Sequence, residues 1–387
     1  MLAVVTDVHY RMAVALLRDL IEGGVTVIAC TRDDAPAPLG FSVRGVARCV
    51  TLGSAGYADE LYTLCADAAR EYGEKPALLP VGAPTLALLS EHRARFDAVC
   101  ALCIATPAQL ALLNDKNALC ALGASLGLPV PQSFAPERGE ALTQFCARVP
   151  FPCVVKPTCG EKFGLHAESR YRIAHTAQEL ADAAAHFSAI TGEMPIVQAY
   201  LSGGGMGCSV LAQNGEVVYA ICHRRVREYP VSGGPSSCCE AVDAPELVAA
   251  ATALVKAVGF SGPAMFEFKL DGTGKPYLLE CNPRIWGTYP LTRAAGTTFA
   301  RCWCALALGA PLPARPAPQH VKMAYYPSDL AAALGYLRHG RIRPFFGAIA
   351  DLLDPRVKNG LYERRDPAPA RAYWKSLMKR RKTNASG

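Results

Sequence analysis

Glu267, Glu280 and Asn282 lie on two neighbouring segments in which apolar and polar residues alternate. The period of two predicts two strands, and the intervening Asp271-Gly-Thr-Gly run predicts the turn of a hairpin. Glu280 and Asn282 are two residues apart, so they share one face of the second strand. If the register also brings Glu267 beside them, two carboxylates and an amide oxygen converge. That ligand set suits Mg²⁺ carrying a nucleoside triphosphate. The alternative is that both glutamates lie on a solvated face of the sheet.

A lysine at a predicted strand end could contact phosphate. Lys156 ends an apolar run and precedes Pro157, which forces the lysine into an extended conformation. The loop that follows contains Gly160 and Gly164. A lysine that ends an apolar strand and faces such a loop is harder to explain as an ordinary surface residue.

An arginine-rich segment follows another predicted strand. The run Arg-Arg-Val-Arg at 224–227 is followed by a glycine pair and two serines, a combination typical of an anion-binding loop. We therefore expect Arg224 or Arg227 to contact a substrate or a reacting group. The residues do not rank the two, and either could instead pair with Glu228 or Glu240.

The first hundred residues predict a scaffold that precedes these groups. Strand and helix patterns alternate through them, which favours parallel strands joined by helical crossovers. The first strand, at 2–6, is not followed by Gly-x-Gly-x-x-Gly, so a dinucleotide cofactor is not supported. A dehydrogenase is therefore a weak interpretation.

The composition limits the classes of protein to which the chain can belong. The chain has 387 residues, 51% hydrophobic and 19% charged, which is typical of a globular protein of two or three domains. No segment supplies the roughly 20 unbroken apolar residues of a membrane span. The first residues lack the basic start of a secretion signal, so we expect a cytoplasmic protein with reduced cysteines. Five positive charges lie within 375–382, so the net charge of +7 reflects a basic tail and not a nucleic-acid surface.

The hairpin sequences Met265-Phe-Glu-Phe-Lys and Leu279-Glu-Cys-Asn-Pro-Arg resemble the metal-binding strands of the ATP-grasp superfamily, in its carbamoyl-phosphate-synthase-like branch of carboxylate–amine ligases. The order of lysines, glycine loop, arginine segment and hairpin is also similar, over residues 114–309. The resemblance implies an ATP-grasp fold of the α/β class. Its parts would be a parallel α/β pre-ATP domain at 1–113, a small lid lobe at 114–194, a larger antiparallel-sheet lobe with the metal site at 195–310, and a C-terminal extension with the basic tail at 311–387.

The resemblance also implies roles for individual residues. Glu267, Glu280 and Asn282 would hold one or two Mg²⁺ ions (or Mn²⁺) against the triphosphate of ATP. Arg284 would stabilise the pentacoordinate phosphorus. The implied nucleotide-binding residues are Lys116, Lys156, Gly160, Gly164, Gln198, Ala199, Tyr200, Leu201, Glu267 and Glu280. Among these, 198–201 would form a hinge whose backbone groups pair with adenine.

The implied reaction joins a carboxylate to an amine, or less attractively to a thiol. The carboxylate attacks the γ-phosphorus of ATP, ADP leaves, and the amine attacks the resulting acyl phosphate to give an amide. In similar enzymes, the segment that matches Arg224 and Arg227 closes over the acyl phosphate or the substrate carboxylate. The implied partners are small amino-acid-like or peptide-like molecules, and a homodimer is the common default.

Two other functions stay open. A phosphotransferase or carbamoyl-phosphate-type enzyme would use the same nucleotide site but end at a phosphorylated product. A degenerate nucleotide-binding module would fit the sparse glycine loop and Met206, which falls about where many relatives carry an acid for the ribose hydroxyls.

Overall fold

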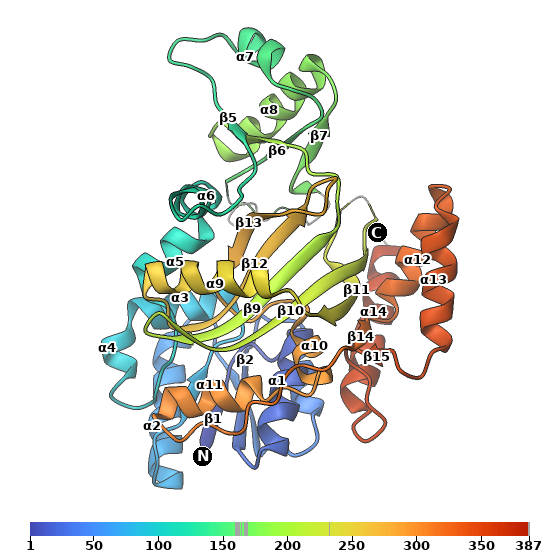
Figure 1. Ribbon diagram of the computed structural model, residues 1–387. Helices are drawn as coiled ribbons and strands as arrows, with labels where there is room; N and C mark the ends of the chain where they lie inside the picture. The colour runs from blue at the N-terminus through green and yellow to red at the C-terminus, as the bar shows by residue number, and fades with distance from the viewer. Residues whose placement is uncertain (159–162, 164, 166–168, 232, 386–387) are drawn as a thin grey trace.

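The computed structural model describes residues 1–158, 163, 165, 169–231 and 233–385, and it contains three β-sheets. In Figure 1 the N-terminal sheet lies at the bottom, a seven-stranded sheet crosses the middle, and a four-stranded lobe stands at the top. This is the division that the sequence predicts: a parallel α/β unit, a small lobe and a larger, mostly antiparallel lobe.

The N-terminal sheet is parallel throughout, with the strand order β3-β2-β1-β4. Its strands are β1 (Leu2–Val5), β2 (Thr26–Arg32), β3 (Arg48–Leu52) and β4 (Ala77–Leu79). The helices of this unit are α1 (Arg11–Glu22), η1 (Leu39–Ser42), α2 (Tyr57–Tyr72), α3 (Ala83–Glu91) and α4 (Arg93–Phe96). β1 and β4 are buried along their whole length, as expected of a parallel sheet covered on both faces. Beyond α4, Ala101 forms an isolated parallel bridge with Ala77 of β4.

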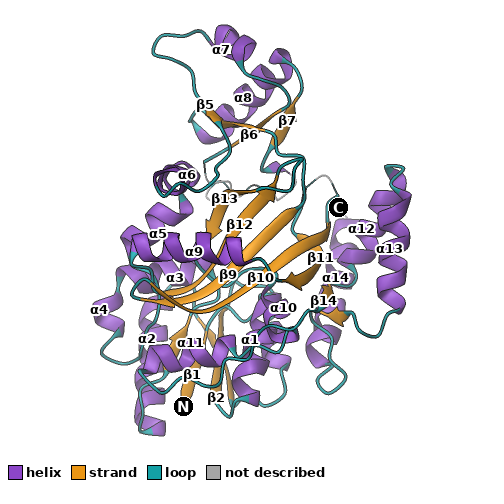
Figure 2. Cartoon of the chain, viewed as in Figure 1, coloured by secondary structure: helices purple, strands orange, loops and turns teal. Residues whose placement is uncertain are grey.

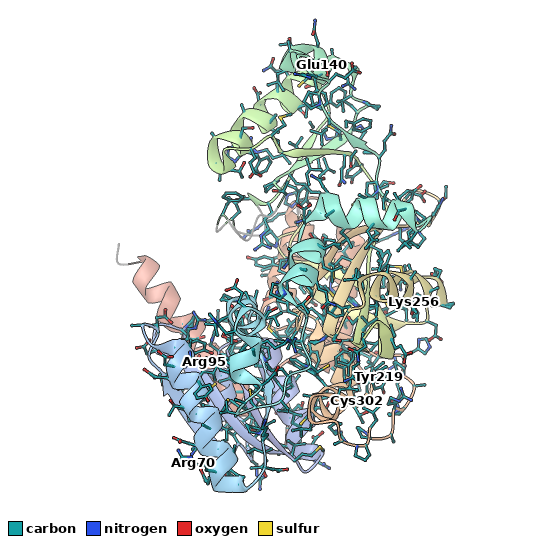
Figure 3. All side chains as sticks on the ribbon, turned by 90° about the vertical axis from the view of Figure 1, so that its left-hand side faces the viewer. Arg70, Arg95, Glu140, Tyr219, Lys256 and Cys302 are labelled. Carbon is teal, nitrogen blue, oxygen red and sulfur yellow. The ribbon has the colours of Figure 1, made fainter. Side chains whose placement is uncertain are left out.

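The small lobe has a core of its own. It follows α5 (Pro107–Asn114) and α6 (Lys116–Ser125), and its antiparallel sheet has the order β5-β8-β6-β7. Its elements are β5 (Ser133–Phe134), α7 (Leu142–Arg148), β6 (Cys153–Lys156), β7 (Arg172–Ala174), α8 (Ala177–Thr191) and β8 (Ile196–Ala199). Phe145, Phe187 and Val197 are buried within it. Figure 3 shows the lobe standing apart from the rest of the chain, with Glu140 at its outer end. Because β8 belongs to this sheet, the chain leaves the lobe after residue 199, beyond the expected boundary at 194.

The large sheet has the order β13-β12-β9-β10-β11-β14-β15, and only its last pair of strands is parallel. Its strands are β9 (Gly205–Gln213), β10 (Glu216–Glu228), β11 (Ser236–Val242), β12 (Gly262–Leu270), β13 (Pro276–Asn282), β14 (Lys322–Ala324) and β15 (Lys358–Asn359). The hairpin predicted from the alternating pattern is β12–β13. In Figure 2, α9 (Pro245–Val258) covers one face of the sheet. α10 (Tyr289–Ala294) and α11 (Phe299–Leu308) contact both this sheet and α1 of the N-terminal unit.

The last seventy residues are attached to the large sheet. β14 and β15 extend it, and α12 (Ser328–Arg338) and α13 (Ile342–Leu353) pack against each other as a helical hairpin at its edge. α14 (Ala368–Ala385) packs against η1 of the N-terminal unit. Within the described residues, no helix is both long enough and apolar enough to cross a membrane.

Candidate active site

The two glutamates lie directly opposite each other on the β12–β13 hairpin. Glu267 pairs with Glu280, and Met265 pairs with Asn282, so all three polar side chains share one sheet face. Next to this pair, Phe268 pairs with Leu278, so Leu279 is left without a partner on β12 and forms a bulge. The Asn282 Nδ2 donates to Glu267 Oε1 at 3.2 Å. The register left open by the sequence therefore brings the two carboxylates and the amide together.

Cationic side chains compensate both carboxylates. The Arg225 guanidinium donates to Glu267 Oε2, and Lys116 Nζ lies 3.2 Å from Glu280 Oε2. Burial raises the pKa of Glu267, although the charge of Arg225 opposes it. Burial alone would also raise the pKa of Glu280, but Lys116 and Lys156 outweigh it and lower that pKa. Glu280 is therefore held as a carboxylate by lysines from two other elements.

Those lysines reach Glu280 from outside the large sheet. Lys116 begins α6, where the Asp115 side chain caps the helix by accepting from two backbone N–H groups, and α6 packs on β13. Lys156 ends β6 of the small lobe and is half-buried. Burial, opposed by the charge of Glu280, lowers the pKa of Lys156 to about 8. Lys116 thus pairs directly with Glu280, whereas Lys156 acts on it through its charge from the small lobe.

Two glycines of β9 leave room on this face for residues of β10. A Cβ at Gly205 would lie 2.9 Å from Arg225 Cδ, and a Cβ at Gly207 would lie 2.3 Å from His223 Cε1. Gly207 also pairs with Glu267 on its other side. Arg225 can therefore cross β9 to reach Glu267. Burial, reinforced by the charge of Arg225, lowers the pKa of His223 to about 3, so its ring is neutral.

The structure does not bring the two predicted arginines to this face. β10 continues to Glu228, so the arginines lie within a strand and not in a loop after it. The Arg224 guanidinium pairs with Glu240, its direct neighbour on β11. A bulge after Arg225 turns Arg227 to the opposite face from Arg225. The arginine that joins the site is Arg225, which the sequence analysis missed.

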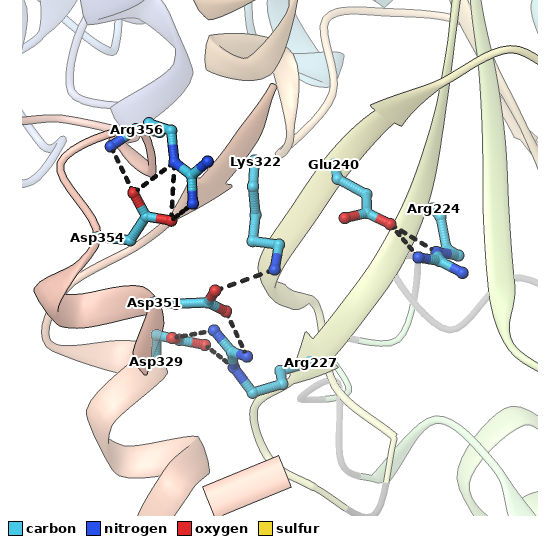
Figure 4. Close-up of polar contacts among 8 residues, drawn as sticks. All are labelled: Arg224, Arg227, Glu240, Lys322, Asp329, Asp351, Asp354 and Arg356. Atoms are coloured by element: carbon cyan, nitrogen blue, oxygen red, sulfur yellow. Dashed lines mark hydrogen bonds and ion pairs between the residues drawn. The ribbon is translucent and has the colours of Figure 1, made fainter. Parts of the chain in front are cut away.

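Figure 4 shows where Arg227 lies instead. Its Nε and Nη2 donate to the Asp329 carboxylate at 2.9 and 2.8 Å, and its Nη1 lies 2.8 Å from Asp351 Oδ2. Lys322 Nζ donates to the other oxygen of Asp351 at 2.9 Å. This network ties α12 and α13 to the large sheet, which is a structural role.

Arg284 and the hinge residues stay predictions. Arg284 is half-buried two residues after Asn282, and its Nη1 donates to the carbonyl of Ile285 at 3.0 Å. The Gln198 side chain is buried in the small lobe, where its Nε2 donates to Ser133 Oγ at 3.0 Å.

The hinge backbone is already partly engaged. The N–H of Ala199 donates to the Gln132 carbonyl at 2.9 Å, and that of Tyr200 donates to the Pro152 carbonyl at 3.4 Å. An adenine would therefore have to use other backbone groups of the hinge, which runs on to the half-buried Leu201. Gly160 and Gly164 lie outside the described residues.

The donor chemistry of the site fits a hard cation. Glu267, Glu280 and Asn282 offer oxygen ligands, which Mg²⁺ prefers. Within the protein, both carboxylates are paired with cationic side chains. In the described part of the chain, no cluster of three or more His, Cys, Asp and Glu side chains has a metal-binding arrangement. A metal here would complete its shell with water or with phosphate oxygens.

Part of the chain matches a known protein family. Residues 192–327 match the family described as "ATP-grasp in the biosynthetic pathway with Ter operon". This segment holds β8, β10 and the β12–β13 hairpin. No curated protein sequence matches the chain.

Solved structures share the fold over most of the chain. A biotin carboxylase complex from Campylobacter jejuni is 16% identical with a TM-score of 0.61, covering 82% of this chain and 73% of that one. The biotin carboxylase domain of 2-oxoglutarate carboxylase from Hydrogenobacter thermophilus, solved with MgADP and bicarbonate, is 16% identical with a TM-score of 0.62, covering 81% and 71%. An L-amino acid ligase from Bacillus licheniformis is 18% identical with a TM-score of 0.55, covering 79% and 73%. At these identities the likeness shows the fold alone.

Residues 192–327 thus match an ATP-grasp family, and the chain shares the ATP-grasp fold with these solved structures. The predicted ATP-grasp fold is thus confirmed. The narrower carbamoyl-phosphate-synthase-like branch stays a prediction.

Proposed function

We propose that the protein is an ATP-dependent carboxylate–amine ligase that uses Mg²⁺ and forms an amide through an acyl phosphate. One observation carries the proposal. Two opposed carboxylates, Glu267 and Glu280, share a sheet face with Asn282; cations of α6 and β10 pair with them, and the charge of Lys156 in the small lobe acts on Glu280. A module that only bound nucleotide would have little need of this full set.

Lys116 and Lys156 are proposed to bind the phosphates. Both lysines now compensate Glu280. Glu267, Glu280 and Asn282 would hold Mg²⁺, which when bound would neutralise charge on the transferred phosphoryl group. The lysines could then turn to phosphate oxygens, where they act as mobile point charges. In this proposal each lysine compensates Glu280 before the nucleotide binds and contacts phosphate oxygens afterwards.

The proposed chemistry proceeds in two displacements. An oxygen of the substrate carboxylate bonds to the γ-phosphorus, while the bond from that phosphorus to the β,γ-bridging oxygen breaks and ADP leaves. The amine nitrogen then bonds to the acyl carbon, the bond from that carbon to the phosphate oxygen breaks, and the nitrogen releases a proton. No protein nucleophile is needed. Cys281, between the two ligand positions on β13, fits this view, because burial raises the pKa of its thiol.

Arginines would stabilise charge and geometry in this scheme. Arg284, two residues after Asn282, is proposed to face the reacting phosphoryl group. Arg225 is proposed to position Glu267, since it donates directly to that carboxylate. Arg224 and Arg227 are not kept in the proposal, because both are paired with carboxylates away from Glu267 and Glu280.

The proposed substrates are a small amino-acid-like or peptide-like carboxylate and an amine. Two likenesses support this class: one structure with the same fold is an L-amino acid ligase, and the matched family is described by a biosynthetic pathway.

A coupled ADP assay with Mg²⁺, across pools of amino acids and dipeptides, tests the proposal. ADP release should require both a carboxylate and an amine. Glu280→Gln should lower turnover by at least about 100-fold. Glu240→Gln is the matched control, because Glu240 pairs with Arg224 away from the site and its loss should leave turnover near that of the wild type. Normal turnover in Glu280→Gln would reject the metal assignment.

The same assay separates the alternatives. ADP release with a carboxylate or bicarbonate alone, together with a stable phosphorylated product, would indicate a phosphotransferase or a carbamoyl-phosphate-type enzyme. Saturable ATP binding without ADP release from any pool would indicate a nucleotide-binding module.

A further inference from the structure

The α12–α13 hairpin carries an apolar surface that the described chain leaves uncovered. We call it the hairpin patch. Its members are large apolar side chains with exposed fractions of 53, 44, 56, 63 and 77%, namely Leu334, Leu337, Ile342, Phe346 and Leu353. Residues 342, 346 and 353 recur on one side of α13, and residues 334 and 337 are neighbours on α12. In Figure 1 the two helices stand at the outer edge of the molecule.

The opposite sides of the same helices hold the hairpin in place. Ala332, Tyr336 and Ala348 are buried. Asp329 of α12 and Asp351 of α13 both pair with Arg227 of the large sheet. The inward sides are therefore fixed by packing and by a buried ion-pair network, which leaves the apolar residues of the patch facing outward.

Basic residues lie at one end of the patch and are concentrated in this part of the chain. Arg338, Arg341 and Arg343 are exposed at the turn between the two helices. Residues 319–387 contain 14 Lys and Arg against 5 Asp and Glu, a net charge of +9. The whole chain has 40 against 33, so residues 1–318 have 26 against 28, a net charge of −2. The entire positive excess lies in the segment that carries the patch.

We propose that the hairpin patch docks on an anionic lipid bilayer. Exposed Ile, Leu and Phe side chains beside arginines are the composition of an interfacial amphipathic helix, whose apolar side enters the headgroup region while the basic residues face anionic lipids. A second copy is disfavoured because pairing two patches would bring their arginines together. A polynucleotide would use the arginines but not the exposed leucines. The inference is independent of the ligase proposal.

α14 supplies a second contact of the same kind. Trp374 and Met378 are 46 and 56% exposed. In the sequence, Lys375 and the basic run at 379–382 flank them. Figure 3 shows the end of this helix extending beyond the body of the protein.

Co-sedimentation of the full chain with vesicles tests the proposal. Vesicles of phosphatidylcholine alone are compared with vesicles that contain about 30% phosphatidylglycerol. The bound fraction should be at least about tenfold higher with the anionic lipid, and it should fall between about 0.1 M and about 0.5 M NaCl.

Two substitutions with matched controls separate the apolar and charged contributions. Phe346→Ser should weaken binding by about tenfold, whereas Ile190→Ser, at a 39% exposed position of α8, should not. Arg343→Gln should weaken binding to the anionic vesicles by about fivefold, whereas Arg70→Gln on the exposed side of α2 should not. Melting temperatures close to that of the wild type would show that each variant is folded.

Three results would overturn the inference. The first is equal binding to neutral and anionic vesicles. The second is a loss of binding that is as large in the controls as in the hairpin variants. The third is the absence of vesicle binding together with a dimer that Phe346→Ser dissociates, or with retention on a polynucleotide that the same variant leaves unchanged.

Discussion

Two arginines on one strand, Arg225 and Arg227, end in opposite environments. Arg225 lies on the face of the candidate site, is 22% exposed and pairs with Glu267. Arg227 lies on the other face, is 3% exposed and pairs with Asp329 and Asp351, which are 0 and 11% exposed. A single bulge separates them. Strand geometry, and not residue type, therefore decides which arginine can meet a ligand.

The two networks also differ in how far their central charges are shielded from solvent. Around Arg227, two aspartates face an arginine and a lysine, and Arg227 and Asp329 are almost completely buried. Around Arg225, the carboxylates of Glu267 and Glu280 are partly exposed and are compensated from three separate elements. A closed network resists rearrangement, whereas an open one can exchange partners when a ligand arrives.

The largest effect should come from breaking the closed network. Arg227→Met removes the partner of Asp329 and leaves that carboxylate buried beside the Ser237 hydroxyl. We expect the free energy of unfolding to fall by about 3–5 kcal/mol, because an uncompensated buried charge is costly. Chemical denaturation measures this change. Arg224→Met is the control, since Arg224 is 58% exposed in its pair with Glu240 and its loss should cost about 1 kcal/mol or less.

Breaking the open network should affect catalysis more than stability. Arg225→Met should lower kcat/KM by about 100-fold through loss of the partner that positions Glu267. Arg225→Lys should recover only part of this, because an ammonium cannot reproduce the geometry of the guanidinium. The readout is kcat/KM for each substrate, together with the Mg²⁺ concentration that gives half-maximal rate. A fall in stability as large as that of Arg227→Met, with normal kinetics in the folded fraction, would make Arg225 structural as well.

Sequence patterns could predict the hairpin but not the arginine. The alternation around Glu267 and Glu280 determines the face of each glutamate, and one turn sequence pairs the strands. The sequence analysis missed Arg225 because its partner Glu267 lies on β12, two strands away from β10 in the sheet. Only the strand order β12-β9-β10 brings these two residues together. One local signal was present: Gly205 and Gly207, two residues apart, remove side chains from one face of β9.

The prediction that Arg227 contacts a substrate failed for a different reason. Simple alternation would put Arg225 and Arg227 on one face, and the bulge between them has no strong sequence signature. The acidic partners of Arg227 lie about a hundred residues later, in α12 and α13. Long-range charge pairing of this kind is set by tertiary structure. It does not follow from local pattern.

The glycines of β9 give a smaller and more specific test. Gly205→Ala would place a methyl group against the flexible Arg225 side chain, which can move aside only by weakening its contact with Glu267. We expect a loss of roughly tenfold in kcat/KM with little change in stability. Gly207→Ala would meet the buried His223 ring, which has less room to move. It should instead lower the free energy of unfolding by about 1–3 kcal/mol. A reversal of these two outcomes would contradict the assignment of Arg225 to the site.

The smallest expected effect is a pH dependence that originates in Lys156. Its pKa of about 8 reflects burial, opposed by Glu280 and by the nearby Cys120 thiol and reinforced by Lys116. The lysine is charged below this value and loses its charge as pH rises through it, so affinity for a polyphosphate should fall in the alkaline direction. From pH 7 to pH 8.5 the charged fraction drops by about fourfold, and the Kd for ATP at constant Mg²⁺ should rise by a similar factor. In Lys156→Arg the guanidinium stays charged, so the Kd should be nearly constant over this range. An equal slope in the two proteins would mean that another group titrates and that Lys156 does not bind the phosphates.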